Sequence, residues 1–230
     1  MKPMNNADVF KDEIGLITDP ILRQAVIDTL NASPTCIQVI SASSTMKYHS
    51  AGDCAVGYID KDGIVHTGGL VNHIKSVVAV CKTLMRNSTF NDIVIKPIRE
   101  SKENSDFEFM LETVYSNAAL AACIIHDCMK PDMTAEHRTR FDHPLLAAEL
   151  FVESIDKYIS RDNKNVELKL YKRLISLAVS SHMGQYNTSK YSDIVLPTPQ
   201  SGLDVFIHLC DYIASRKFIN IDLTKVEYGV

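Results

Sequence analysis

A run of small apolar residues in the middle of the chain constrains the fold more than any other feature. Residues 117–125 read NAALAACII, inside a stretch of helical periodicity that covers residues 107–130 and ends before Pro131. Small side chains let neighbouring helices approach closely, so a helix of this composition is expected at the centre of a bundle. Because His126 and Asp127 follow the run directly, this helix would carry a polar pair into the interior.

Helical patterns also account for most of the remaining chain. A first helical region is broken or restarted at Pro20, and a Gly-Gly pair at 68–69 opens another helix. Pro144 suits the first position of a later helix. The polar, irregular stretch 86–106 is predicted as a loop, as is the proline-containing stretch 185–200. We therefore predict a mainly α-helical bundle. Its helices are expected at residues 7–32, 70–85, 107–130, from 142 onward, 166–182 and 201–217.

One segment departs from helical spacing. Between residues 36 and 66, Val56 and Tyr58 alternate with small or polar residues. The tetrad Asp60–Gly63 (DKDG) is typical of a turn, and the apolar Ile64 follows it. This segment therefore predicts a small β-hairpin beside the helices.

Composition narrows the class of protein. The chain has 230 residues, 46% of them hydrophobic and 23% charged, which is typical of a globular protein that can bury a core. No repeat or linker is apparent, so we predict one domain over residues 1–230. The net charge of -4 argues against a basic surface for long nucleic acids. The sequence shows no membrane-spanning run and no secretory leader, and its six cysteines form no CxxC pair, so we expect a reducing, cytoplasmic location.

Histidines and aspartates recur at helical positions that face the expected core. His73 lies on the apolar stripe of its helix, and Asp211 lies on the buried face of the last helix. His143 stands at a helix start and His182 at a helix end. Taken singly, each is more often a structural residue than a metal ligand, for example a hydrogen-bonded core histidine or a helix cap. The polar doublet after the small-residue run is costly to bury unless a partner such as a metal ion compensates it.

Taken in order, these residues resemble the ligand set of the HD-domain superfamily, which is named for its His-Asp doublet. The resemblance runs over roughly residues 66–217 and leaves an N-terminal helical and hairpin extension at 1–65. It is closest to the branch with HD-type 3′-to-5′ exoribonucleases and cyclic-nucleotide phosphodiesterases. An HD dipeptide alone is weak evidence, whereas the ordered set is specific. The strings that carry it are Gly68-Gly69-Leu70-Val71-Asn72-His73, Ile125-His126-Asp127-Cys128-Met129-Lys130, Ser181-His182-Met183-Gly184 and His208-Leu209-Cys210-Asp211.

The resemblance implies a centre of two divalent metal ions. One ion would be bound by the first histidine, the doublet and the last aspartate. The second would be bound by the aspartate of the doublet and the two intervening histidines. Imidazole and carboxylate ligands suit Mn²⁺, Fe²⁺ or Ni²⁺, with Zn²⁺ or Mg²⁺ as further options. The implied ligands are His73, His126, Asp127, His143, His182 and Asp211.

The resemblance also implies roles at the reaction centre. Asp127 would bridge the ions, and Lys130 would act as a further positive charge near the phosphate, although a lysine at a helix end is also favoured by the helix dipole alone. The family carries a histidine near the substrate ahead of the Gly-Gly-Leu string, for which His49 and His66 are both candidates. Structural or solvent-exposed roles are also open for the remaining substrate-binding candidates. These are Arg138, Arg140, Tyr186 and His208.

Together these features predict a metal-dependent phosphohydrolase. Two cations lower the pKa of water and neutralise phosphate oxygens, which suits a phosphodiesterase acting on a nucleotide, a cyclic nucleotide or a short oligonucleotide. One alternative is a 3′-to-5′ exonuclease on single-stranded RNA or DNA, although the chain lacks an obvious basic and aromatic platform. Two others are an HD-type di-iron oxygenase and a non-catalytic binding module. The sequence leaves both a monomer and a homo-oligomer open.

Overall fold

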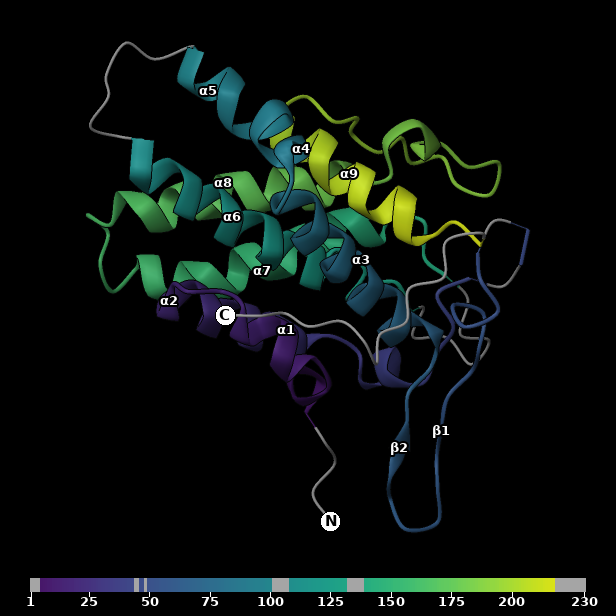
Figure 1. Cartoon of the computed structure of the whole chain (residues 1–230). Helices are drawn as coiled ribbons and strands as arrows, with labels where there is room; N and C mark the ends of the chain where they lie inside the picture. The colour runs from purple at the N-terminus through teal and green to yellow at the C-terminus, as the bar shows by residue number, and fades with distance from the viewer. Residues whose placement is uncertain (1–4, 44–45, 48, 101–107, 132–138, 218–230) are drawn as a thin grey trace.

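The computed structural model describes residues 5–43, 46–47, 49–100, 108–131 and 139–217. Within these ranges the fold is mainly helical, as predicted, with one two-stranded antiparallel sheet (Figure 1). None of the described helices combines the length and the apolar character that crossing a membrane requires. The helices are α1 (Lys11–Gly15), α2 (Pro20–Ala32), α3 (Gly69–Met85), α4 (Ser88–Phe90), α5 (Lys96–Glu100), α6 (Glu108–Ile125), α7 (His143–Ile159), α8 (Val166–Ser181) and α9 (Gly202–Ala214), and the strands are β1 (Tyr58–Ile59) and β2 (Val65–His66).

Helix α6 lies at the centre of the bundle. It packs against α2, α3, α8 and α9 (Figure 1). Every residue from Ala118 to Cys128 is 4% exposed or less, so the small-residue run is buried on all sides, as its composition predicts. The helix ends at Ile125 and therefore delivers His126 and Asp127 directly into the interior.

Local sequence sets where several helices begin. Asp19 precedes Pro20, and its carboxylate accepts hydrogen bonds from the amides of Ile21 (2.8 Å) and Leu22 (2.7 Å). These bonds satisfy amides that have no partner within the helix, and proline at the first position needs none. The predicted restart of the helix at Pro20 is therefore confirmed. The side chain of Asn165 caps α8 in the same way.

The prediction of a loop over residues 86–106 is wrong for most of its length. Helix α4, a π-helical turn at Asn91–Ile95 and α5 follow one another without a break. Phe90 anchors this segment, because its ring packs edge-to-face on Phe206 of α9 with 4.9 Å between centroids. Pro97 lies at the second position of α5, directly after the π-helical turn. The polar residues that suggested a loop cover the solvent side of a docked helix, and the last few residues of the stretch lie outside the described ranges.

The small hairpin is confirmed. Strand β1 pairs with β2 so that Tyr58 lies opposite His66. The carboxylate of Asp60 accepts a hydrogen bond from the amide of Ile64 at 2.9 Å, and Gly63 takes a φ of 78°, which favours glycine. Figure 1 shows the hairpin extending away from the helices.

Candidate metal centre

Six side chains from five helices converge at one end of the small-residue helix. The doublet follows α6, and the other four residues come from α3, the start of α7, the end of α8, and α9. Five of the six are no more than 2% exposed, while the side chain of Asp211 is 20% exposed. The structure thus brings together the complete set of ligands that the sequence suggests. They are His73, His126, Asp127, His143, His182 and Asp211.

Asp127 lies in the middle of this cluster, and its two oxygens face different histidines. Its Oδ2 lies 3.7 Å from Nε2 of His73 and 3.5 Å from Nε2 of His126. Its Oδ1 lies 2.9 Å from Nε2 of His143 and 3.6 Å from Nε2 of His182. A carboxylate placed in this way can bridge two neighbouring cations.

Several polar atoms in the cluster lack a partner. Asp211 places Oδ1 3.0 Å from Nε2 of His73 and joins the first group of ligands. Yet Nε2 of His73, of His126 and of His143, and Oδ1 of Asp127, are buried without a hydrogen-bond partner among the described residues. Buried polar atoms are normally paired, so two divalent cations at these positions would supply the missing partners. The residues present therefore fit a binuclear centre.

The second ring nitrogen of three histidines is held by the backbone. Nδ1 of His126, His143 and His182 lies 2.8, 2.5 and 2.7 Å, respectively, from the carbonyl oxygen three residues earlier. Because a carbonyl oxygen only accepts, Nδ1 carries the proton and Nε2 keeps its lone pair for a cation. The carbonyls of Cys123 and Val179 lie in the last turns of α6 and α8, where backbone groups lack a full set of helical partners, and that of Arg140 lies just ahead of α7. His73 differs, since its Nδ1 is buried and has no such bond within the described residues.

Burial and neighbouring charges shift the pKa values of the clustered residues in opposite directions. Burial alone would raise the pKa of Asp127, but Lys130 and His126 hold that pKa well below its usual range. Burial lowers the pKa of His143. At His126, burial also acts to lower the pKa, but the carboxylates of Asp127 and Asp211 outweigh it and raise the pKa. Asp127 is therefore ionised, as a metal ligand must be.

Lys130 is the charged partner of Asp127. Its Nζ donates a hydrogen bond to Oδ2 of Asp127 at 2.7 Å, and its side chain is 13% exposed. Burial opposes its charge, yet the nearby carboxylates of Asp127 and Asp211 raise the pKa of Lys130. Lys130 thus keeps a full positive charge next to the ligand cluster.

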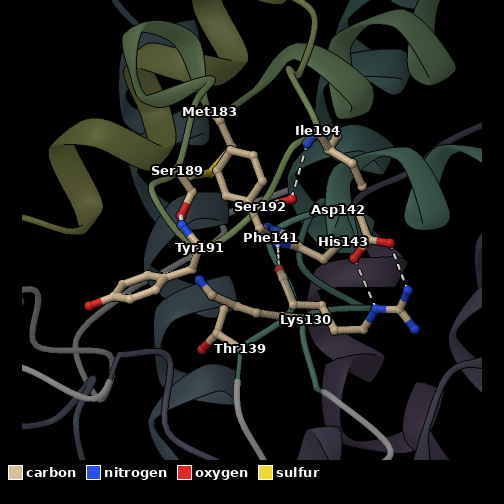
Figure 2. Close-up of a pocket in the computed structure, with 11 residues that line it drawn as sticks. Lys130, Thr139, Phe141, Asp142, His143, Met183, Ser189, Tyr191, Ser192 and Ile194 are labelled. Carbon is tan, nitrogen blue, oxygen red and sulfur yellow. Dashed lines mark hydrogen bonds and ion pairs between the residues drawn. The ribbon is translucent and has the colours of Figure 1, made fainter.

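A cavity of about 500 Å³ opens beside the ligands (Figure 2). Lys130 and His143 line it, so the cavity reaches the second group of ligands. Phe141, Met183 and Tyr191 give it apolar and aromatic surface. Part of the loop predicted at residues 185–200 forms one wall, which places this loop next to the centre.

The two candidate histidines ahead of the Gly-Gly-Leu string lie in different places. The ring centroid of His49 is 5.8 Å from that of His73, and its Nδ1 is 3.4 Å from Oδ2 of Asp53. His66 lies in the exposed hairpin, where its Nε2 is 3.1 Å from Oδ2 of Asp60. The structure therefore brings His49, and not His66, to the ligand cluster.

The predicted substrate-binding residues that follow the doublet in the sequence also lie in different places. Arg140 lines the cavity, but its guanidinium makes two hydrogen bonds to Asp142, at 2.9 and 2.6 Å. Tyr186 is 45% exposed and lies outside the cavity lining. Arg138 lies outside the described residues. Of the two described residues, Arg140 lies at the cavity and Tyr186 does not line it.

His208, the last of the substrate-binding candidates, contacts the backbone at the end of α8. Its Nδ1 lies 2.7 Å from the carbonyl oxygen of His182, so it holds the end of α8 in place. Gly184 takes a φ of 57°, and a Cβ at this position would lie 2.3 Å from the ring of His208. The glycine of the Ser-His-Met-Gly string is therefore required by both its backbone conformation and the histidine packed against it.

Sequence reasoning missed two residues near the site. Phe141 lines the cavity, and Asp53 is buried beside His49 and His73. The position of Phe141 close ahead of a predicted ligand was a weak signal. Asp53 had no local signal, because its neighbours in space are brought to it by packing.

Comparisons with known proteins returned no relatives. No protein-family model matches the chain, and no curated protein or solved structure matches it either. The suggested relationship to HD domains therefore depends on the ordered residues and on their geometry.

Proposed function

We propose that the protein is an HD-domain phosphodiesterase that uses two divalent cations to hydrolyse a nucleotide, a cyclic nucleotide or a short oligonucleotide. The position of the Asp127 carboxylate supports this proposal most strongly, because each of its two oxygens faces two imidazole nitrogens. A structural ion pair needs one partner, whereas a carboxylate that faces four imidazoles is suited to bridge two ions. The order of the ligands along the chain supports the HD-domain relationship.

The ligand set suits Mn²⁺, Fe²⁺ or Ni²⁺, since it combines four imidazoles with two carboxylates. When bound, the ions supply Lewis acidity and lower the pKa of a water molecule at neutral pH. The chain itself orients the ligands. The Nδ1 protons of His126, His143 and His182 are held by backbone carbonyls, which aims each Nε2 at the centre.

Lys130 provides a positive charge at the boundary between the ligands and the cavity. A phosphodiester in the cavity would place its non-bridging oxygens near this amine. Charge builds up on these oxygens as the attack proceeds, and a buried ammonium group stabilises it more than one in water does. We therefore assign Lys130 to phosphate binding and transition-state stabilisation.

The cavity favours a small nucleotide substrate. Its volume of about 500 Å³ falls in the range of small-molecule sites. Phe141 and Tyr191 offer rings on which a base can stack, and Met183 adds apolar surface. The net charge of -4 gives no general attraction for long nucleic acids, so recognition is expected to depend on this cavity.

The test combines metal analysis with a substrate screen. The purified protein is loaded with Mn²⁺, Fe²⁺ or Ni²⁺ and assayed on nucleotides, cyclic dinucleotides and short oligonucleotides. Asp127→Asn removes the shared charge and is expected to raise the barrier by about 4 kcal/mol or more, a loss of at least about 1,000-fold in kcat. Asp156→Asn is the matched control, because Asp156 pairs with Lys172 on the surface.

Three results would contradict the proposal. The first is full activity in Asp127→Asn, and the second is a wild-type protein that binds no divalent ion. The third is a di-iron protein that consumes O₂ and cleaves no phosphodiester, which would indicate the oxygenase class. Processive shortening of long single strands would keep the chemistry but change the substrate to that of an exonuclease.

A further inference from the structure

His73 is the one candidate ligand histidine whose second nitrogen is not held by a backbone carbonyl. The other three sit at helix ends and fold back onto a carbonyl three residues earlier. His73 lies inside the first turns of α3, where the preceding carbonyls already accept helical amides. Its Nδ1 is buried and has no hydrogen-bond partner within the described part of the chain. Its own helix therefore offers no acceptor for this nitrogen.

Asp53 is a buried carboxylate next to His73. It is 4% exposed, and ligand atoms of Asp53, His49 and His73 all lie within 4.8 Å of one another. Burial acts to raise the pKa of Asp53, but the contact with His49 and the charges of His73 and His49 outweigh it and lower the pKa. Asp53 therefore presents an ionised carboxylate to two imidazoles.

The backbone around Asp53 packs against the start of α3. The carbonyl of Asp53 accepts from the amide of Ala42 at 2.7 Å, and the amide of Gly69 donates to the carbonyl of Ala55 at 2.8 Å. A Cβ on Gly69 would lie 2.0 Å from the carbonyl oxygen of Asp53, so only glycine permits this approach. The Gly-Gly pair thus brings the Asp53 segment against the helix that carries His73.

We propose that Asp53 is a positioning residue of the metal centre, whose carboxylate accepts the Nδ1 proton of His73 and aims Nε2 at the first ion. The same carboxylate holds His49 at the edge of the cluster. A separation of up to 4.8 Å is bridged by one water molecule or closed by a small rotation of the Asp53 side chain. The proposal rests on the metal centre of the proposed function.

The physical effect of Asp53 is on the affinity for the first ion. A carboxylate on the far nitrogen fixes the tautomer of a ligating imidazole and makes its other nitrogen a stronger donor. Loss of such a partner weakens metal binding by about 10–100-fold in metalloproteins. The second ion, which would be held by His143 and His182, does not depend on this contact.

The experiment compares Asp53→Asn with Asp60→Asn. Both substitutions remove one carboxylate that contacts a histidine, but the Asp60–His66 pair lies in the exposed hairpin. Mn²⁺ binding to wild type and to both variants is measured by equilibrium dialysis, with thermal melting as a check on folding. We expect Asp53→Asn to weaken one of two binding steps by about 10–100-fold and Asp60→Asn to change neither.

A second measurement keeps the proposal testable if Asp53→Asn does not fold. The tautomer of His73 is read by ¹⁵N NMR of the histidine rings in wild-type protein with Zn²⁺ added. We expect the proton on Nδ1, whereas a deprotonated Nδ1 would overturn the proposal.

The outcomes separate this proposal from the proposed function. A wild-type protein that binds no ion defeats both. Two ions bound with unchanged affinity in Asp53→Asn defeat the role of Asp53 alone. A third ion bound in wild type and lost in Asp53→Asn would also overturn it, because Asp53 would then be a ligand itself.

Discussion

Asp127 combines deep burial with contacts to four imidazoles and one ammonium group. A carboxylate that is 1% exposed is stable as an anion only when positive charge surrounds it. Lys130 and His126 provide that charge. Cations in the two ligand groups would add to it.

A prediction at this scale concerns His182. Its Nε2 faces Oδ1 of Asp127, in the group that would hold the second ion. His182→Ala is therefore expected to reduce the metal content from two ions to one, while His73→Ala weakens the other ion. Metal analysis after dialysis checks both variants, with circular dichroism to confirm that the helices remain. Two ions retained in His182→Ala would show that the centre is not binuclear as described.

A second residue-scale prediction concerns pH. The pKa of His126 is raised in the metal-free protein, chiefly by Asp127 against the effect of burial. Its protonation therefore adds to the stability of the metal-free fold below about pH 6.5, and this contribution is lost as the pH rises through the raised pKa. Metal ions need the deprotonated nitrogen, so their affinity is expected to fall as the pH is lowered.

Titration of Mn²⁺ binding at several pH values between about 6 and 8 measures this effect. Binding should release protons, which a pH indicator in weak buffer detects. The pKa of Asp127 is held well below its usual range, so this residue stays ionised over the whole pH range of the titration. It therefore contributes nothing to the change of Mn²⁺ affinity with pH. An affinity that does not change with pH would contradict the assignment of His126 as a ligand.

At the scale of elements, the start of α3 is fastened to the preceding segment by backbone contacts. The amides of Gly68 and Leu70 donate to the carbonyls of Gln38 (2.8 Å) and Ile40 (3.0 Å). These bonds satisfy amides that the helix leaves unpaired at its N-terminus. The segment ahead of α3 therefore caps the helix and fixes the position of His73.

The prediction for this element is that Gly69→Ala destabilises the fold. A Cβ would lie 2.0 Å from the carbonyl oxygen of Asp53, and both sides of this contact are backbone. We expect a loss of more than about 1 kcal/mol in the free energy of unfolding, measured by urea denaturation. Gly15→Ala is the control, because nothing lies within 4 Å of a Cβ there. Equal free energies of unfolding for Gly69→Ala and Gly15→Ala would mean that the Asp53 segment does not pack closely against α3.

At the scale of the whole molecule, one continuous core encloses most of the cysteines. All six are free thiols. Cys81, Cys123 and Cys210 come from α3, α6 and α9 and lie within 4.8 Å of one another, fully buried among apolar residues. Burial acts to raise the pKa of Cys81, but its contacts with Cys123 and Cys210 lower it to about 5. Three thiolates there would place uncompensated negative charge in an apolar core, so the three are not expected to ionise together and act mainly as packed side chains.

Alkylation of the native protein tests this picture of the core. Burial raises the pKa of Cys123 and Cys128, and both are inaccessible. Cys36 and Cys54 are partly exposed. We expect iodoacetamide to label only the two partly exposed cysteines until the protein is unfolded, as read by mass spectrometry of the peptides. Rapid labelling of a core cysteine would show that the bundle opens far more readily than its packing indicates.

Much of the helical fold and the residues of the candidate metal centre were predictable from sequence. The small-residue run predicts a central helix, because only small side chains permit close approach on all faces. Asp19 and Pro20 predict a helix start, because the cap is made by residues adjacent in the chain. The ligands were predictable as a group because their order resembles that of a known family, although each one taken singly has an ordinary structural explanation.

The rest required the tertiary structure. Residues 88–100 form helices because Phe90 docks on Phe206, a partner that the local sequence does not reveal. His49 and His66 were equal candidates until packing placed the first beside His73 and the second in the hairpin. The sequence by itself determined periodicity, caps and the types of side chain, because these depend on neighbours along the chain. Contacts between segments far apart in sequence decided which of His49 and His66 lies at the cluster, and they also decided the position of Asp53.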